Sequence, residues 1–217
     1  MNRKYIVVIW ALLATTACKT TSKGTNRPLD TALRANSGAS HNHQVPEAVA
    51  VGYADSVNSG AIATDTMKRS PRRVAMLTVG GCHVHIDYGS PGVKGRTIWG
   101  GLVAYNQVWS AGAHAATTLA ISKRIVVNGT TITPGTYGFF AIPGKAEWIL
   151  IINRNYKQHL ADAYDPAEDV VRTTVTAVEH PFTPRLTYSI TQNAANKGAI
   201  TLAWDKLAVQ LPFEVLP

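Results

Sequence analysis

The sequence predicts an all-β fold, an antiparallel β-sandwich or jelly roll of about eight to ten strands, over residues 70–217. Three observations support this prediction. Short runs of β-branched and aromatic residues recur after Ser70-Pro71, turn signals separate these runs, and helical periodicity is scarce among them. Many short strands at regular spacing are typical of two packed antiparallel sheets.

The expected strands are short runs with turn signals between many of them. In chain order they are residues 74–79, 82–88, 117–122, 124–127, 137–142, 148–152, 170–178, 186–191, 199–204 and 207–215. Asn128-Gly129 predicts a two-residue hairpin turn, because both residues tolerate a positive φ. Pro143-Gly144-Lys145 predicts a second hairpin turn. A helical turn is suggested only for residues 156–164.

Residues 82–88 alternate between apolar and polar side chains, as in a strand with one buried face. Cys82 lies on the apolar face, and we expect a buried thiol there. His83, His85 and Asp87 share the other face. Two histidines and a carboxylate at this spacing could hold a zinc ion in an open site, with His114 as a fourth ligand. The preferred interpretation is a polar strand face that is exposed to water.

The first residues resemble an export signal with a lipoprotein cleavage site. Arg3 and Lys4 precede an apolar stretch at residues 5–14, which is too short to span a bilayer. Small residues then lead to Cys18. We expect a signal peptide at residues 1–17 and a lipidated, palmitate-bearing Cys18 in the cell envelope, on the outer membrane. The alternative is cleavage near Ala17 and release into the periplasm.

Residues 18–69 are expected to comprise the lipidated cysteine and a flexible, disordered linker. Ser, Thr, Ala, Asn and Gly dominate the segment, and Tyr53 is its only Phe, Trp or Tyr. Such a segment cannot bury enough apolar surface to offset the entropy lost on ordering. An alanine-rich run at residues 47–63 is where a transient helix is expected. His41 and His43 could bind a metal weakly, but a solvated pair is the preferred interpretation.

The net charge of +8 is spread along the chain. A basic balance favours acidic partners such as nucleic acid or anionic lipid. The sequence has neither a basic helix nor an aromatic–basic recognition motif, so nucleic acid is not an expected partner.

The loop at residues 90–101 is a candidate ligand site. Arg96 offers a planar guanidinium fork for a carboxylate or phosphate. Trp99, Tyr105 and Trp109 could line a groove for a sugar or peptide, with His114 close by. The preferred interpretation for Trp99 and Trp109 is packing in the core.

Residues 164–169 form an acidic turn before the strand at residues 170–178. Asp165 and Asp169 could help to bind calcium, although the spacing is not that of an EF-hand. The preferred interpretation is a solvated turn with one internal ion pair to Arg172 or Arg96. For Arg96, a structural ion pair with Asp165 or Asp169 is preferred over ligand binding.

These motifs together resemble the family named domain of unknown function 2911, which occurs largely in exported proteins of Bacteroidetes and related bacteria. The resemblance covers Ser70-Pro71 and residues 86–118, 128–129, 134–148, 164–172 and 202–215. It implies export and a compact β-rich domain, and it implies no established activity.

The resemblance also ranks the candidate residues. Four charged residues match the family pattern and are better candidates than the strand histidines: Arg96, Asp165, Asp169 and Arg172. After Trp109 the family typically has Arg, Asn and Glu at the positions of Ser110, His114 and Ala115. If those groups form a site in the family, this chain has altered it.

We therefore expect a non-catalytic binding module on a membrane anchor, without a cofactor, whose partner is a small polar ligand such as a sugar, or an envelope protein. One alternative is a metal-assisted or other hydrolase-like envelope enzyme, working near Arg96, His114 and the face of His83, His85 and Asp87. Another is a structural envelope protein without a small ligand. Convergence of the three histidines in a cleft would favour the enzyme, and an aromatic-lined groove without such a cluster would favour binding.

Overall fold

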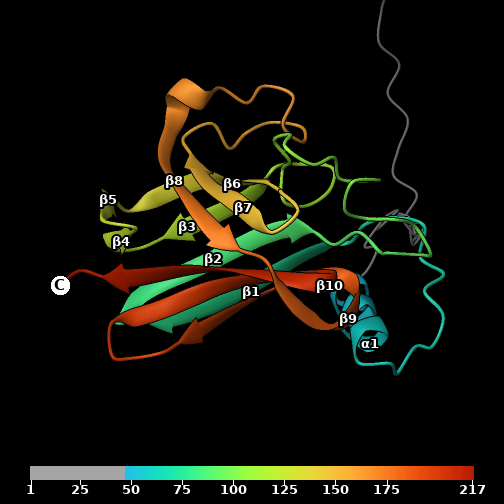
Figure 1. The fold of residues 1–217 in the computed structure, drawn as a ribbon. Coiled ribbons are helices and arrows are strands. Elements are labelled where there is room, and N and C mark those ends of the chain that lie inside the picture. The colour runs from blue at the N-terminus through green and yellow to red at the C-terminus, as the bar shows by residue number, and fades with distance from the viewer. Residues whose placement is uncertain (1–46) are drawn as a thin grey trace, which may run out of the picture. The chain divides into compact units, whose positions relative to one another are not determined.

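The computed structural model describes residues 47–217, which form two antiparallel β-sheets around a shared core (Figure 1). The larger sheet has six strands in the order β1-β2-β3-β6-β7-β8, and the smaller sheet has four in the order β5-β4-β10-β9. This arrangement confirms the predicted all-β sandwich. The predicted signal peptide, Cys18, and the pair His41 and His43 lie outside the described residues.

The strands are short in the larger sheet and long in part of the smaller one. The larger sheet comprises β1 (Arg72–Val79), β2 (Cys82–Gly89), β3 (Thr117–Ile121), β6 (Gly135–Ile142), β7 (Glu147–Asn153) and β8 (Asp169–Thr176). The smaller sheet comprises β4 (Ile125–Val127), β5 (Thr130–Ile132), β9 (Val178–Gln192) and β10 (Lys197–Val215). Within residues 47–217, no helix has the length and apolar character needed to cross a membrane.

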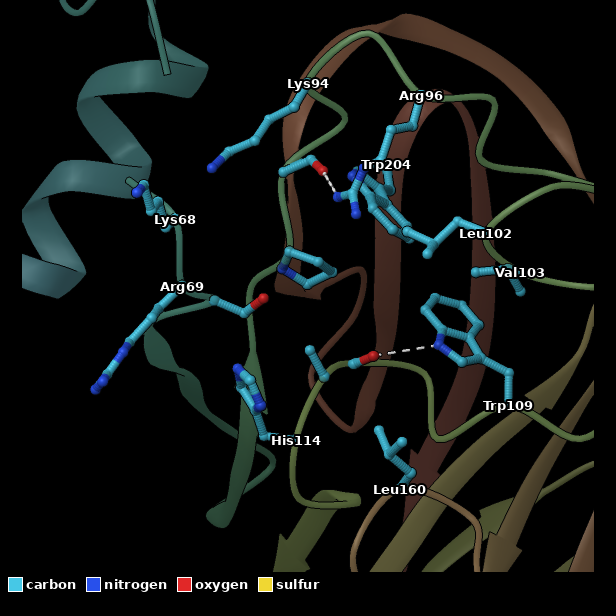
Figure 2. Close-up of a pocket in the computed structure, with 15 residues that line it drawn as sticks. Lys68, Arg69, Lys94, Arg96, Leu102, Val103, Trp109, His114, Leu160 and Trp204 are labelled. Atoms are coloured by element: carbon cyan, nitrogen blue, oxygen red, sulfur yellow. Dashed lines mark hydrogen bonds between the residues drawn. The ribbon is translucent and has the colours of Figure 1, made fainter. Parts of the chain in front are cut away.

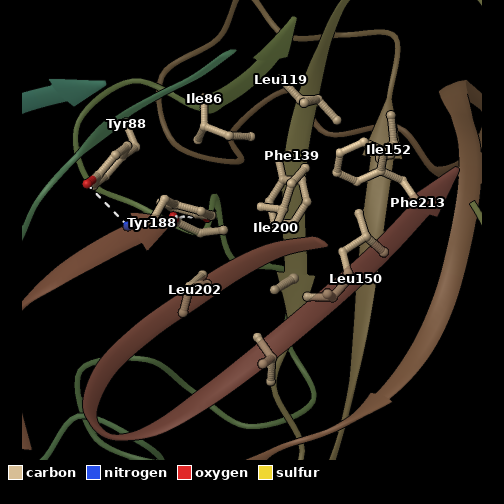
Figure 3. Close-up of a cluster of buried hydrophobic side chains, with 14 of the residues drawn as sticks. Ile86, Tyr88, Leu119, Phe139, Leu150, Ile152, Tyr188, Ile200, Leu202 and Phe213 are labelled. Carbon is tan, nitrogen blue, oxygen red and sulfur yellow. Dashed lines mark hydrogen bonds between the residues drawn. The ribbon is translucent and has the colours of Figure 1, made fainter. Parts of the chain in front are cut away.

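The core lies between the two sheets, as Figure 3 shows. Side chains from β2, β3, β6 and β7 meet side chains from β9 and β10. Tyr188 brings a hydroxyl into this core, and the hydroxyl donates to the carbonyl of Ala111 at 2.8 Å. The backbone N–H of Tyr188 donates to the hydroxyl of Tyr88. These bonds satisfy buried polar groups that would otherwise destabilise the core.

The burial pattern of β2 confirms the predicted alternation. Cys82, Val84 and Ile86 are fully buried, while the intervening side chains are exposed or half-buried. Cys82 is a free, buried thiol, as expected. Asn128 and Gly129 have φ of 47° and 77° and join β4 to β5, which confirms the predicted hairpin turn.

The C-terminal strands differ from the prediction. The sequence suggests two strands at residues 199–204 and 207–215, whereas β10 is one strand whose pairing with β9 shifts register around Asp205. Asp205 has a φ of 56°, and such a bulge interrupts the alternation of side chains without ending the strand. Residues 156–164, where a helical turn is suggested, form hydrogen-bonded turns from His159 to Asp162 and from Ala161 to Tyr164, and the 3-10 helix η1 follows at Pro166–Glu168.

The segment before β1 packs on the sandwich, which corrects the predicted linker over residues 47–69. Helix α1 (Glu47–Asn58) contacts β1 and β9, and Ala54 and Val57 are buried. The Asn58 side chain accepts from the backbone N–H of Arg185 and donates to its carbonyl. We call residues 59–69 the strap.

Arg185 in β9 holds the strap from inside the protein. Its side chain is fully buried and lies 2.7 Å from the carboxylate of Asp65. The same guanidinium donates to the carbonyls of Met67 and Ser90 at 2.9 Å and 2.8 Å. The amino-acid composition of the strap does not predict this packing, because the strap is held by the buried Arg185 and not by apolar surface of its own.

Candidate functional site

A cleft of about 460 Å³ opens between the strap and the loops that follow β2 (Figure 2). Its walls come from residues 68–70, 91–96, 102–103 and 109–114, together with Leu160 and Trp204. A volume of this size is within the range of known small-molecule sites.

One side of the cleft is basic. Lys68 and Arg69 project from the strap, and Lys94 and Arg96 from the facing loop. The Arg96 guanidinium donates to the carbonyls of Val93 and Gly92 in its own loop. The predicted ion pair between Arg96 and an acidic-turn aspartate is therefore wrong, since the guanidinium folds back onto the loop.

The other side of the cleft is apolar and includes Trp109, Leu102 and Val103. The indole N–H of Trp109 donates to the carbonyl of Gly112 at 3.2 Å. Behind this wall the ring of Trp99 packs against those of Trp109, Trp148 and Trp204, with centroids 4.6–5.9 Å apart. The cleft is therefore backed by a rigid aromatic cluster.

The predicted groove of three aromatics is only partly formed. Trp109 lines the cleft, whereas Trp99 supports it from the core side. Tyr105 packs over Gly100, where an added Cβ would lie 2.6 Å from the tyrosine ring. Trp204 completes the aromatic lining instead, and it comes from β10, far away in the sequence.

His114 lines the cleft in a left-handed backbone conformation, with a φ of 69°. Its carbonyl accepts from the N–H of Leu160 at 2.9 Å. Asn and His both tolerate this conformation better than most residues. Asparagine is typical at this position in the resembling family, so a backbone requirement explains both residue types. Ser110, another departure from the pattern, is buried.

The histidines of β2 lie elsewhere. His83 and His85 line a shallow cavity of about 260 Å³ that shares no lining residue with the cleft. Their ring centroids are 6.2 Å apart. The enzyme hypothesis requires His83, His85 and His114 to converge in one cleft. In the structure they do not converge.

The predicted zinc site on β2 is not assembled either. Asp87 is ion-paired with Arg72 of β1 at 2.7 Å. Within residues 47–217, no group of three or more His, Cys, Asp or Glu side chains is placed to hold a metal ion. Successive side chains on one strand face are about 7 Å apart, so the third group is out of reach and pairs with a neighbouring strand instead.

The acidic turn forms a separate network. Tyr164 donates to Asp169 at 2.7 Å, and Arg172 donates to the Tyr164 hydroxyl at 2.8 Å and to Asp169 at 2.5 Å. Buried Asn153 donates to Asp169 at 2.7 Å. The predicted ion pair to Arg172 is thus confirmed, and the network ties η1 to β7 and β8.

Two further details concern Asp165 and Tyr164 in this acidic turn. Asp165 caps η1, because its carboxylate accepts from the N–H of Ala167 at 2.9 Å. Burial raises the pKa of Tyr164 above its usual range, although the bond from Arg172 opposes this change. Asp165, Asp169 and Arg172 belong to this network, while Arg96, Trp109 and His114 belong to the cleft.

Sequence reasoning missed half of the basic side of the cleft. Lys68-Arg69 is visible in the sequence as a basic pair, but it lies in a segment whose composition suggests a linker. Lys94 lies two residues before Arg96, and this pair is the sequence feature that indicates a basic loop at the cleft.

A family model described as "Protein of unknown function (DUF2911)" matches residues 70–213. No curated protein and no solved structure shows significant similarity to the chain. The match begins at Ser70, so Lys68 and Arg69 of the cleft precede the matched segment.

Proposed function

We propose that this chain, which belongs to the DUF2911 family of proteins of unknown function, is a binding module that holds a small polar ligand in the cleft. The supporting observation is the composition of the cleft, an aromatic and aliphatic wall opposite a basic one. Ring-bearing polar molecules, such as sugars, suit a wall of this kind.

The cleft supports binding better than hydrolysis. Acid–base catalysis usually requires two groups that exchange protons with the substrate, placed within hydrogen-bond reach. Among the described residues, His114 is the one imidazole in the cleft lining, and no carboxylate or thiol accompanies it there. The histidines of β2 line the other cavity.

The membrane part of the proposal rests on the sequence alone. Small residues precede Cys18, after a basic start and a short apolar stretch. Lipidation of Cys18 would display the binding domain in the cell envelope, on the outer membrane. Each buried CH₂ group of the acyl chains contributes about 0.8 kcal/mol, so several chains give a durable anchor.

Palmitate labelling and membrane fractionation test the anchor. Cys18→Ser should abolish the label and release the protein from the membrane fraction. Cys82→Ser removes the other cysteine and should leave both readouts unchanged. Membrane association that survives Cys18→Ser would contradict the proposed anchor.

A calorimetric titration of the full-length protein with small polar ligands tests whether the cleft binds them. Leu102 is half exposed at the cleft wall, and Leu102→Ala should weaken binding about three- to ten-fold by removing apolar contact. Met76 is a similarly exposed apolar residue on β1, away from the cleft. Met76→Ala should therefore leave affinity unchanged, and equal effects of the two substitutions would contradict the assignment.

A further inference from the structure

We infer that the ligand of this cleft is an anion whose carboxylate or phosphate group is held between the strap and the loop at residues 91–96. The inference rests on the proposed function and deepens it by specifying the charge of the ligand. It depends on the basic side chains, whereas the proposed function depends on the whole cleft.

The first argument is charge compensation. Among the described residues outside the cleft, five arginines form ion pairs with carboxylates, including Arg72 with Asp87 and Arg172 with Asp169, and Arg124 forms none. The four cations of the cleft differ, because within residues 47–217 none of them forms an ion pair: Lys68, Arg69, Lys94 and Arg96. Among the described residues, no aspartate or glutamate lines the cleft.

The concave shape strengthens this effect. Like charges gathered around a cleft with low-dielectric walls create a focused positive potential, which raises the local concentration of anions. Gathering them also costs repulsion between the four charges. A bound anion would remove that cost, and it would gain several charged hydrogen-bond donors at once.

The second argument is that two of the four donors, Lys94 and Arg96, are held in place before any ligand arrives. The Lys94 ammonium donates to the carbonyl of Met67, so the loop and the strap are bridged. Gly92 allows their close approach, because a Cβ at this position would clash with the Asp65 carboxylate. Positioned donors lose less entropy on binding than mobile ones.

Arg96 retains free donors for a ligand. A guanidinium has five N–H groups. Its Nε and Nη2 atoms bond to carbonyls of the loop, and Nη1 has no partner among the described residues. The bonded side therefore orients the group, while the free side remains available for an anion.

The apolar wall narrows the ligand class. Trp109 and Leu102 face the basic side across the cleft (Figure 2). A simple inorganic anion would leave this wall uncovered. An anion on a sugar-sized ring would contact both sides, so an acidic sugar or a sugar phosphate is the class that fits.

Calorimetry of the full-length protein with glucose, glucuronate and glucose 6-phosphate tests the inference. The last two ligands separate a carboxylate from a phosphate source of the charge, and glucose is their neutral counterpart. At low salt we expect at least one of the acidic ligands to bind and glucose to bind at least ten-fold more weakly. Raising the salt from about 0.05 M to about 0.5 M should weaken the binding of the acidic ligand.

Charge-removing variants locate the effect. The double variant Lys68→Gln/Arg69→Gln should weaken binding of the acidic ligand about three- to five-fold for each charge removed. Lys94→Gln, in the loop at residues 91–96, should have a similar effect. Lys145→Gln/Lys206→Gln removes the same net charge from exposed positions outside the cleft and should leave affinity unchanged.

The outcomes separate the inference from the proposed function. If glucose binds as tightly as the acidic ligands and Leu102→Ala weakens it, the cleft binds small molecules but the anion inference is wrong. If both double variants weaken binding equally, the charge effect is not local and the inference is also wrong. If none of the three ligands binds, both proposals are overturned and the structural envelope role is favoured.

Discussion

The charged residues on the two sides of the strap differ in whether they have ion-pair partners. On the inner side, Arg185 is fully buried and meets Asp65 and two backbone carbonyls. On the outer side, Lys68 and Arg69 are exposed at the cleft and form no ion pair within the described residues. The inner charge therefore holds the strap in position, and the outer charges remain available to a ligand.

This contrast separates residues that build the protein from residues that could bind something. Removing one member of a buried ion pair, such as Arg185 with Asp65, leaves the other charge uncompensated. Exposed cations in a cleft contribute little to stability. Substitutions on the two sides of the strap should therefore have different consequences.

The largest expected effect comes from the inner side. Arg185→Met should lower the free energy of unfolding by about 3–5 kcal/mol, because it leaves the Asp65 carboxylate without its counter-ion and removes the buried donor to the Met67 and Ser90 carbonyls. Urea unfolding measures this change. The double variant Arg185→Met/Asp65→Leu should recover part of the loss, since both members of the pair are then apolar. A loss below about 1 kcal/mol for Arg185→Met would contradict the anchoring role.

An intermediate effect is expected at alkaline pH, where two tyrosines with satisfied hydroxyls titrate. Burial raises the pKa of Tyr188 well above its usual value, and it raises that of Tyr164. Folding therefore favours the protonated hydroxyls. Their contribution to the free energy of unfolding is complete below about pH 10, and it is lost as the pH rises through the pKa values of the folded state.

Urea unfolding at a series of alkaline pH values checks this prediction. Tyr188→Phe should flatten the decline in the free energy of unfolding above about pH 10, and Tyr164→Phe should flatten it less. Tyr156 is half-buried, and its side chain has no hydrogen-bond partner within the described residues. Tyr156→Phe is therefore the control. A decline of equal slope in all three variants would contradict the assignment.

The smallest effect is expected on the outer side. Lys68→Gln and Arg69→Gln should each change the free energy of unfolding by less than about 0.5 kcal/mol, since both side chains are exposed. Urea unfolding of each variant provides the measurement. A loss above about 1 kcal/mol would mean that these cations stabilise the strap, and the contrast between its two sides would no longer hold.

The sequence predicts the parts of the fold that depend on local patterns. The alternation in β2 and the turn at Asn128-Gly129 need only neighbouring residues, because side-chain direction and φ are local properties. The single strand β10 could not be predicted in the same way. Asp205 looks like a strand end, and only its pairing with β9 turns it into a bulge.

The candidate site was predicted in part for the same reason. Arg96, Trp109 and His114 are close in sequence and line one cleft. Asp165, Asp169 and Arg172 were grouped with them, but hydrogen bonds with Tyr164 and Asn153 draw Asp169 and Arg172 into a separate network. Which charged groups pair is decided by strand register, and register is not visible in a single segment.

By itself the sequence determined the fold class, because β-branched runs and turn residues leave few alternatives to an antiparallel sandwich. Tertiary structure alone decided the position of the strap, since the residue that anchors it is 120 positions away from Asp65. It also decided which cations lack counter-ions. Charge compensation acts across space, so it emerges only when distant segments come together.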